Sequence, residues 1–425
     1  MPEIHNRSGP APRLPELMAP AGNFEKLATA IHYGADAVYL GGRQFGLRAR
    51  AGNFSNDMIR QGVIYAHERG VKVYVTVNIF AHNRDLNALP DYLRQLQAAA
   101  IDGLIIADPG VFAVARQVVP ALPVHLSTQA NVTNHAAAVF WQQQGAGRLN
   151  LARELSLAEI IQIRAAVDAE LEVFVHGALC ISYSGRCMLS SYMTGRDANQ
   201  GHCAHPCRYS YRLVEEKRPG EYFPVEEDDR GTYIFNAKDL CLLTVLPQLV
   251  AAGVDAFKIE GRMKSIFYVG GVVRVYRAAL DYLAALPAEA WHTPDPVCLP
   301  DEFMQEIVKT GTRGTTENFI RHPPGSTEMN YVTTGTAPVC EPVAVIRRAG
   351  GTPLVEIRNT VQVGEPVAYM GPGLTVINIR IIRMTDETGR DIERAHPGNR
   401  IFLRTAPGLG AARENGILRR EIDRP

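Results

Sequence analysis

Apolar and polar positions follow one repeated unit along most of the chain: a short apolar run, a turn containing Gly, Asn or Asp, and a segment with helical spacing. After Asn23, for example, the apolar residues at 24, 27, 28 and 31 fall on one helical face, and Gly34 can end the helix. Eight apolar runs have this form: ELMAPAG from residue 16, AVYLGG from 37, VKVYVTVN from 71, GLIIAD from 103, VHLSTQ from 124, RLNLARE from 148, EVFVHG from 172 and AFKIEG from 256. Such β-α units predict an α/β fold, a (β/α)8 TIM-like barrel, with a doubly wound open sheet as the alternative.

The same pattern divides the chain into domains. Residues 1–13 are predicted to be a flexible tail, and residues 14–290 the barrel. Almost 80 residues separate the seventh and eighth runs, where a β-α-β unit needs only about 30. Residues 178–255 are therefore predicted to be an insertion. We expect residues 291–332 to be a linker with a helical segment, 333–412 a small C-terminal all-β barrel, and 413–425 a polar C-terminal tail.

Polar residues gather where the predicted strands end, at the face on which barrel enzymes assemble their sites. Each of these residues alone is more often a helix cap or a turn former, but as a converging set they favour a polar pocket. The set consists of Asn23, Arg43, Gln44, Asn78, Asp108, Ser127, Thr128, Gln129, Asn131, Arg153, Glu154, His176, Glu260 and Arg262.

Composition narrows the class of protein. Basic and acidic residues balance at 44 each, which excludes a strongly basic coat but not a local basic patch. The seven cysteines are an odd number and are bunched, which argues against a secreted disulfide framework. The N-terminal stretch MPEIHNRSGPAPRLPEL lacks the apolar core of a signal peptide, and nowhere do 18 apolar residues run together. We therefore expect a cytoplasmic protein with no membrane partner.

Five of the cysteines fall in the predicted insertion. Thiolates gathered at one end of a barrel repel each other, so a cation must offset their charge. The irregular spacing, without paired C-x-x-C motifs, favours an iron-sulfur cluster over zinc, and reduced core cysteines are the remaining alternative. The five are Cys180, Cys187, Cys203, Cys207 and Cys241, whereas Cys298 and Cys340 stand apart as ordinary residues.

The same region is locally basic. Between residues 180 and 212, four arginines face a single acid, Asp197, and four tyrosines are interleaved with them. Guanidinium forks bind phosphate or carboxylate and aromatic rings stack on exposed bases, so single-stranded RNA or a small anion would fit here. Solvated arginines and packed tyrosines are the alternative. The arginines are Arg186, Arg196, Arg208 and Arg212, of which the last three are the predicted RNA contacts.

The cysteine region carries a family resemblance. The stretch EVFVHGALCISYSGRCMLSS resembles the signature of peptidase family U32, the collagenase-like peptidases, with matches at Glu172, Phe174, Gly177, Ala178, Leu179, Cys180, Gly185, Cys187, Leu189 and Ser190. The resemblance extends through LMAPAGNFEKLATAIHYGADAVYLGG, NAKDLCLL and KIEGRMKS into the C-terminal β domain, and so covers nearly the whole chain. Within the family, the chain is most similar to tRNA hydroxylation proteins of the TrhP type.

The resemblance implies a cofactor and a reaction. It implies a four-iron four-sulfur cluster on Cys180, Cys187, Cys203 and Cys241, with Cys207 as a neighbour and possible substitute. It also implies conversion of wobble uridine in tRNA to 5-hydroxyuridine, with prephenate as co-substrate in place of molecular oxygen. Other branches hydroxylate ribosomal RNA or a quinone precursor, and a few members give the family its peptidase label.

Two other functions are weighed against hydroxylation. A metalloprotease would show H-E-x-x-H, but Val71 stands where the second histidine belongs after His67 and Glu68, and no G-x-S-x-G motif is present. Proteolysis with Cys180 near His176 stays as the alternative, and a noncatalytic, metal-stapled RNA-binding module is a third.

Candidate roles follow from position. We expect the cluster to lie above the barrel mouth and the pocket to hold a small dicarboxylate such as prephenate. Three basic residues, Arg186, Arg262 and Lys264, are predicted anion clamps, and Gln129 and Asn78 are further substrate contacts. His176 and Glu260 are the predicted catalytic groups for proton transfer.

Overall fold

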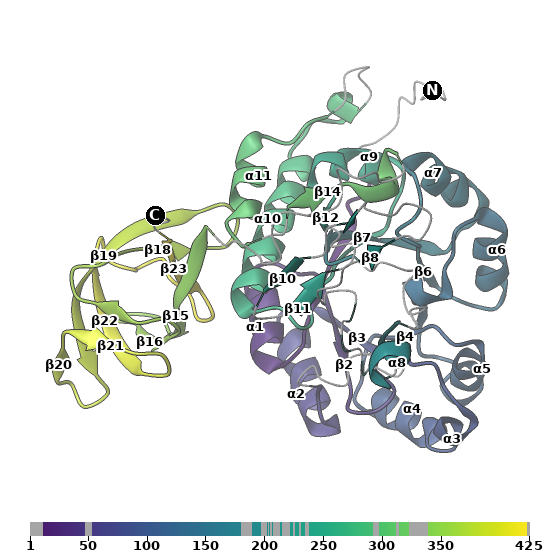
Figure 1. Ribbon diagram of the computed structural model, residues 1–425, viewed down its shortest axis with the longest axis horizontal. Coiled ribbons are helices and arrows are strands. Elements are labelled where there is room, and N and C mark those ends of the chain that lie inside the picture. The colour runs from purple at the N-terminus through teal and green to yellow at the C-terminus, as the bar shows by residue number, and fades with distance from the viewer. Residues whose placement is uncertain are drawn as a thin grey trace.

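Eight parallel strands close into a barrel in the computed structural model (Figure 1). The structure describes residues 12–46, 53–179, 189–196, 202, 204, 206, 213–214, 222–223, 226–228, 231–233, 238–291, 297–311, 314–322 and 339–422. The barrel strands are β1 (Glu16–Pro20), β2 (Ala37–Gly41), β3 (Lys72–Val77), β4 (Gly103–Ile106), β5 (Val124–Leu126), β6 (Arg148–Asn150), β7 (Glu170–Gly177) and β13 (Ala256–Ile259). Because β13 pairs with both β7 and β1, the sheet has no free edge at this point. The barrel prediction is confirmed, and the open-sheet alternative is wrong.

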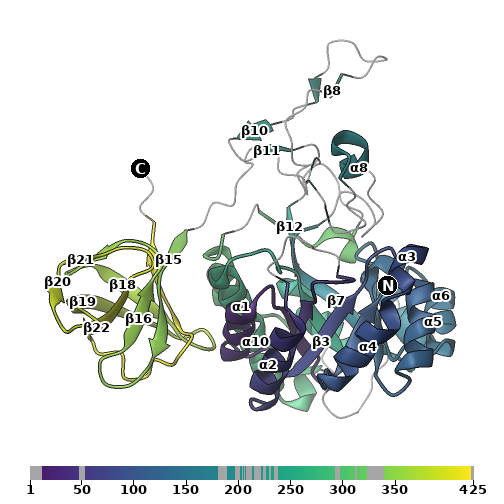
Figure 2. The same cartoon turned by 90° about the horizontal axis from the view of Figure 1, so that it is seen from below.

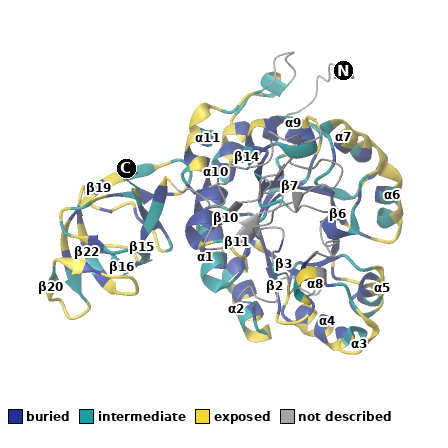
Figure 3. Cartoon of the chain, viewed as in Figure 1, coloured by how far each residue is buried: buried dark blue, intermediate teal, exposed yellow. Residues whose placement is uncertain are grey.

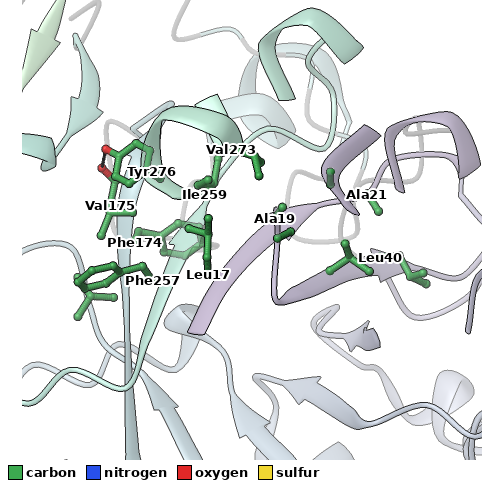
Figure 4. Close-up of a cluster of buried hydrophobic side chains, with 14 of the residues drawn as sticks. Leu17, Ala19, Ala21, Leu40, Phe174, Val175, Phe257, Ile259, Val273 and Tyr276 are labelled. Atoms are coloured by element: carbon green, nitrogen blue, oxygen red, sulfur yellow. Dashed lines mark hydrogen bonds between the residues drawn. The ribbon is translucent and has the colours of Figure 1, made fainter. Parts of the chain in front are cut away.

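Helices cover the outside of the barrel. They are α1 (Phe24–His32), α2 (Asn56–His67), α3 (Asn83–Leu86), α4 (Leu89–Ala98), α5 (Pro109–Val118), α6 (His135–Gln143), α7 (Leu157–Ala166), α9 (Leu246–Ala251) and α10 (Ile266–Ala284). The side chain of Asn23 accepts a hydrogen bond from the Lys26 backbone N–H at 2.9 Å, so the predicted cap of α1 is present. Buried positions line the strands and inner helix faces, whereas exposed positions lie on the outer helix faces (Figure 3). Leu17, Val175 and Tyr276 belong to the packed layer between the strands and α10 (Figure 4).

Charged residues fill part of the barrel interior. Arg148, 3% exposed, lies 2.7 Å from Glu16 and 3.6 Å from Glu172, and Lys258 lies 2.8 Å from Glu172. Two cations and two carboxylates make this buried group neutral, as the low dielectric of a protein interior requires.

The insertion returns to the barrel through a strand that pairs with β7. Strand β12 (Asp239–Cys241) pairs antiparallel with the end of β7, with Leu240 opposite Gly177 and Cys241 opposite His176. Strand β14 (Thr315–Thr316) then pairs with β12. The predicted linker 291–332 thus contributes β14 and helix α11 (Asp301–Val308) to the large domain and does more than connect two domains.

Further short elements of the insertion lie on the same side of the barrel as β12 (Figure 2). Helix α8 (Leu189–Thr194) comes first along the chain, and two antiparallel strand pairs follow it. These are β8 (Leu213–Val214) with β9 (Tyr222–Phe223), and β10 (Glu226–Asp228) with β11 (Gly231–Tyr233).

The C-terminal domain is a small antiparallel β-barrel. Its strands β15 (Cys340–Arg348), β16 (Leu354–Ile357), β18 (Pro366–Met370), β19 (Val376–Asp386), β22 (Arg400–Ala406) and β23 (Ile417–Glu421) close through the β18–β19 pair. Short strands β17 (Val361–Gln362), β20 (Asp391–Ile392) and β21 (Arg394–Ala395) complete it. The predicted tail at 413–425 is wrong, because β23 lies between β15 and β18. Its sequence ILRRE looks polar, but Arg419 is buried against a carboxylate.

Buried ion pairs join the two domains. Glu306 of α11 lies 3.0 Å from Arg274 of α10 and 3.0 Å from Arg419 of β23. Arg274 is fully buried and also donates to the Gly373 carbonyl oxygen at 2.6 Å. The Tyr33 hydroxyl donates to the Met370 carbonyl oxygen at 2.8 Å, across the same interface.

Replacing Glu306 should destabilise the protein strongly. Glu306→Gln leaves two buried guanidinium groups without their shared carboxylate, so we expect the free energy of unfolding to fall by about 3–5 kcal/mol. Urea denaturation followed by circular dichroism measures the loss. The matched control is Glu302→Gln, an exposed position on the same helix, and equal losses in the two variants would contradict the prediction.

A crevice of about 520 Å³ lies between the domains, lined by the ends of α1 and α2 and by residues 413–415. It lies at the amino-terminal ends of β2 and β3, away from the face where barrel sites form. Burial, and secondarily the charge of Arg413, lowers the pKa of His32 to about 4. The unfolded chain therefore binds a proton at His32 between pH 6.5 and 4 that the folded chain excludes.

Stability should therefore fall as the pH is lowered through this range. From the lowered pKa of His32 we expect a loss of up to about 3 kcal/mol between pH 7 and 4. The Glu16 and Glu306 carboxylates have pKa values below 4.5 because of their cationic partners, so they act only at lower pH. Urea midpoints of His32→Gln should depend less on pH between 4.5 and 6.5 than those of the native chain. An unchanged slope would refute this role of His32.

Candidate active site at the barrel mouth

Four side chains at the carboxyl ends of neighbouring strands carry buried polar atoms with no hydrogen-bond partner among the described residues. Buried polar atoms in proteins are nearly always paired, so a group of exceptions on adjacent strands marks a place that a ligand can complete. The atoms are Gln129 Nε2 after β5, Asn150 Oδ1 at the end of β6, Arg153 Nε just beyond β6, and His176 Nε2 at the end of β7.

Gln129 and Asn78, two predicted substrate contacts, are brought together across the mouth. Asn78 follows β3 and donates from Nδ2 to Gln129 Oε1 at 2.6 Å, and Ser127 Oγ lies 3.3 Å from the same oxygen. Because both contacts engage the oxygen of the amide, the Nε2 donor of Gln129 is left for another acceptor.

His176 is held as a neutral imidazole. It is 1% exposed, and burial, partly opposed by Asp239, lowers its pKa to about 4. Its Nδ1 lies 3.3 Å from the Tyr276 hydroxyl, which itself donates to the Val175 carbonyl oxygen at 2.8 Å. Since that hydroxyl has one proton and gives it to Val175, Nδ1 must carry the imidazole proton and Nε2 is an acceptor.

Tyr276 also contacts Cys241. The Cys241 sulfur lies 3.8 Å from the Tyr276 oxygen and the thiol is 4% exposed. Burial raises the pKa of this thiol. Tyr276 therefore lies between the predicted catalytic histidine and a predicted cluster ligand. Its sequence context, VVRVYRAAL, shows only an amphipathic helix and gave no signal of this role.

The segment after β13 closes the other side of the mouth. Gly177 has a φ of +115°, and a Cβ at this position would lie 2.6 Å from the Glu260 carbonyl oxygen, so only glycine allows β7 and β13 to end this close together. The Tyr268 hydroxyl donates to that carbonyl oxygen at 3.2 Å. Lys264 Nζ lies 5.0 Å from the centre of the Tyr268 ring.

Arg262 makes hydrogen bonds that stabilise the fold at the barrel mouth. It is 4% exposed, and its Nη2 donates to Asn53 Oδ1 at 2.7 Å while Nη1 lies 3.5 Å from Thr76 Oγ1. These contacts tie the segment after β13 to β3, and its role as an anion clamp stays a prediction.

Two protein-family models together match most of the chain. The model described as peptidase family U32 matches residues 22–330, and the model of the peptidase family U32 C-terminal domain matches residues 341–419. The chain belongs to peptidase family U32.

Several relatives of this U32 chain carry names from RNA modification, whereas one from Methanocaldococcus jannaschii, 34% identical over 400 residues, is named an uncharacterized protease. It is 41% identical over 387 residues to tRNA hydroxylation protein P1 of Bacillus subtilis, covering 90% of each chain. It is 37% identical over 403 residues to tRNA hydroxylation protein P of Escherichia coli, covering 84% of this chain and 86% of that one. It is also 35% identical over 305 residues to the 23S rRNA 5-hydroxycytidine C2501 synthase of Escherichia coli, covering 72% of this chain and 45% of that one.

The remaining predicted site residues of the U32 chain lie partly outside the described residues. Those outside are Cys180, Arg186, Cys187, Cys203, Cys207, Arg208 and Arg212. Arg196 is described, and its Nε donates to the His202 carbonyl oxygen at 3.1 Å. Within the described ranges no three His, Cys, Asp or Glu side chains gather as a metal site, so the cluster stays a prediction. None of the described helices is long and apolar enough to cross a membrane.

Sequence reasoning missed Asn150 of this U32 site and named Arg153 only as a member of the polar set at the strand ends. Asn150 is 2% exposed, and its only sequence signal is a polar residue inside the run RLNLARE. The Arg153 guanidinium stacks on the Phe174 ring at 4.0 Å from the ring centre and donates from Nη1 to the Ala178 carbonyl oxygen at 2.9 Å. Its Nε is thereby held in a fixed position at the mouth.

Asn150 should be dispensable for stability in this U32 protein. Because its Oδ1 has no partner among the described residues, Asn150→Leu should leave the free energy of unfolding unchanged or raise it by up to about 1 kcal/mol. Asn78→Leu should lower it by about 1–2 kcal/mol, because Gln129 loses a donor. Urea denaturation of both variants measures the difference, and a larger loss for Asn150→Leu would contradict a ligand-facing role.

Proposed function

We propose that this protein is an RNA hydroxylase that modifies a nucleobase of tRNA. The observation that carries the proposal is the group of unpaired buried polar atoms at the barrel mouth, beside the point where β7 leads into the cysteine-bearing insertion and β12 returns from it. The names of relatives that align with most of the chain support the same class of reaction.

The polarity of these atoms suits a pyrimidine. Gln129 Nε2 and Arg153 Nε are donors, whereas Asn150 Oδ1 and His176 Nε2 are acceptors. Uracil presents two carbonyl oxygens and one imide N–H on its edge, so donors and an acceptor together can hold it. A base must leave its stack to reach such a buried mouth, and single-stranded loops make this least costly. These points support wobble uridine as the target and 5-hydroxyuridine as the product.

A four-iron four-sulfur cluster on Cys180, Cys187, Cys203 and Cys241 forms part of the proposal. Of these, Cys241 is described, and it is buried opposite His176, where an uncompensated thiolate would be unfavourable. A cluster bound here would supply electron transfer next to the mouth. The residues of the chain would orient the base, exclude water and hold the His176 proton at Nδ1.

The proposal includes prephenate as co-substrate in place of molecular oxygen. Two carboxylates require cationic partners, and Arg186, Arg262 and Lys264 are the proposed ones. Lys264 lies against the Tyr268 ring just past β13, which is a suitable position for a carboxylate contact.

Proteolysis is the alternative function. Its predicted nucleophile, Cys180, lies outside the described residues. The described Cys241 thiol does not fit that role, because it is buried and contacts the Tyr276 hydroxyl at 3.8 Å. His176 points its Nδ1 to the same tyrosine and is therefore not paired with that thiol as a base.

Removing one predicted ligand should abolish both iron and modification. A strain that lacks its own copy and carries Cys187→Ala should contain no 5-hydroxyuridine above background, and the variant purified without oxygen should lose its iron and sulfide. Mass spectrometry of digested tRNA and iron and sulfide assays measure the two effects. Cys298→Ala, an exposed cysteine, is the matched control. Normal modification by an iron-free Cys187→Ala variant would refute the proposal.

A further inference from the structure

The outer surface of two neighbouring strands in the C-terminal domain is rich in arginine. On β19, Ile381 and Met384 point into the small barrel, and Arg380 and Arg383 are exposed. On β22, Ile401 and Leu403 are buried. The outward residues of β22 are Arg400, Phe402 and Arg404.

The register of the sheet brings the cationic residues together. Arg383 lies directly opposite Arg404 in the antiparallel pair, and Thr385 lies opposite Phe402. The Arg348 guanidinium lies 5.5 Å from the centre of the Phe402 ring. We call Arg348, Arg380, Arg383, Arg400, Arg404 and Phe402 the arginine face. Like charges directly opposite each other on a sheet are unfavourable, which favours an anion between them.

Few carboxylates offset this charge. Residues 339–422 contain 12 arginines and no lysine, against 9 acidic residues. Asp391 pairs with Arg383 at 2.6 Å, but both side chains are more than half exposed, so this pair is weak. Glu356 lies 3.9 Å from Arg400 and is shared with Arg347 at 2.9 Å. Among the described residues, no carboxylate lies within ion-pair distance of Arg404.

Most of the arginine face lies on the side of the small barrel away from the large domain, whereas Arg400 borders that domain, because its neighbour Glu356 also pairs with Arg347, which pairs with Glu25 of α1. Cys340, Val345, Met370 and Ile417, from β15, β18 and β23, pack into the core of the large domain. Strands β20, β21 and β22 lie on the opposite side of the small barrel in both views (Figures 1 and 2). The surface is therefore open to a partner while the domain stays docked.

We propose that the arginine face binds phosphates of the same tRNA whose base enters the barrel mouth. This inference rests on the proposed function and adds a second RNA contact to it. Guanidinium forks bind phosphate oxygens in pairs, and the use of arginine without lysine suits such geometry. Phe402, half-buried between Arg400 and Arg404, offers an apolar ring to a base or ribose, which favours RNA over an acidic protein segment.

The test compares two pairs of arginine substitutions in the full-length protein. Arg383→Gln with Arg404→Gln removes the opposed pair. Arg60→Gln with Arg94→Gln is the matched control. Both of these side chains are more than half exposed, and each pairs with an acidic residue on its own helix, so each resembles Arg383, which pairs with Asp391. Affinity for tRNA is measured by filter binding between 50 and 200 mM salt, and urea denaturation verifies that both variants are folded.

The variant with Arg383→Gln and Arg404→Gln should bind tRNA about tenfold more weakly than the native protein at moderate salt. The slope of log affinity against log salt should fall by about 1.4, which is about 0.7 for each phosphate that an arginine no longer neutralises. KM for tRNA should rise with kcat nearly unchanged, because the face is remote from the mouth. The control pair should retain its affinity and its slope.

Three results would overturn the inference: equal losses of affinity in the two pairs, no measurable binding of tRNA by the native protein, or equal dependence of poly-glutamate binding on Arg383 and Arg404. The last would indicate an acidic protein partner. If tRNA binding depends on the pair but no hydroxylation is detected with the native protein, the proposed reaction fails while the arginine face stands. If the variant with Arg383→Gln and Arg404→Gln hydroxylates tRNA normally and binds it with unchanged affinity, the proposed reaction stands and the arginine face is refuted.

Discussion

The strand pairing of β7 is the constraint on which the candidate site depends. The strand pairs with β13 on one side and with β6 and then β12 on the other, because its last residues extend beyond the end of β6. The extension places Cys241 opposite His176, and the positive φ of Gly177 lets the Glu260 backbone approach. The insertion, the histidine and the segment after β13 are thereby fixed to one another by backbone hydrogen bonds, which hold side chains more firmly than loops do.

Buried charge serves two separate purposes in the molecule. In the barrel interior, Arg148 and Lys258 are balanced by two carboxylates, so the strands enclose a neutral polar core. At the interface, Glu306 stands between Arg274 and Arg419 and ties α10, α11 and β23 together. Both groups are costly to break because each remaining charge would be left unpaired. The mouth differs, since the described residues supply no partners for its four buried polar atoms.

The sequence predicted what periodicity and capping control, and missed what tertiary contacts decide. The eight apolar runs fell on the eight strands, since a strand buried on both faces must be apolar. Strand β23 was missed because its arginine is buried by a carboxylate more than 100 residues away in the chain. Asn78 and Gln129 could be named as polar residues at strand ends, but their mutual hydrogen bond depends on the barrel's curvature. Tyr276 could not be found at all, because it lies on helix α10 and its partners come from strands β7 and β12.

Rigid docking of the C-terminal domain has a consequence for substrate selection. The Arg274, Glu306 and Arg419 contacts hold the small barrel at a set position relative to the large one. The distance between the barrel mouth and the outer strands β19 and β22 is consequently fixed by the fold. An RNA that touches both must present a phosphate run at that spacing from its extruded base, so the protein gauges the overall shape of its substrate as well as the identity of one nucleotide.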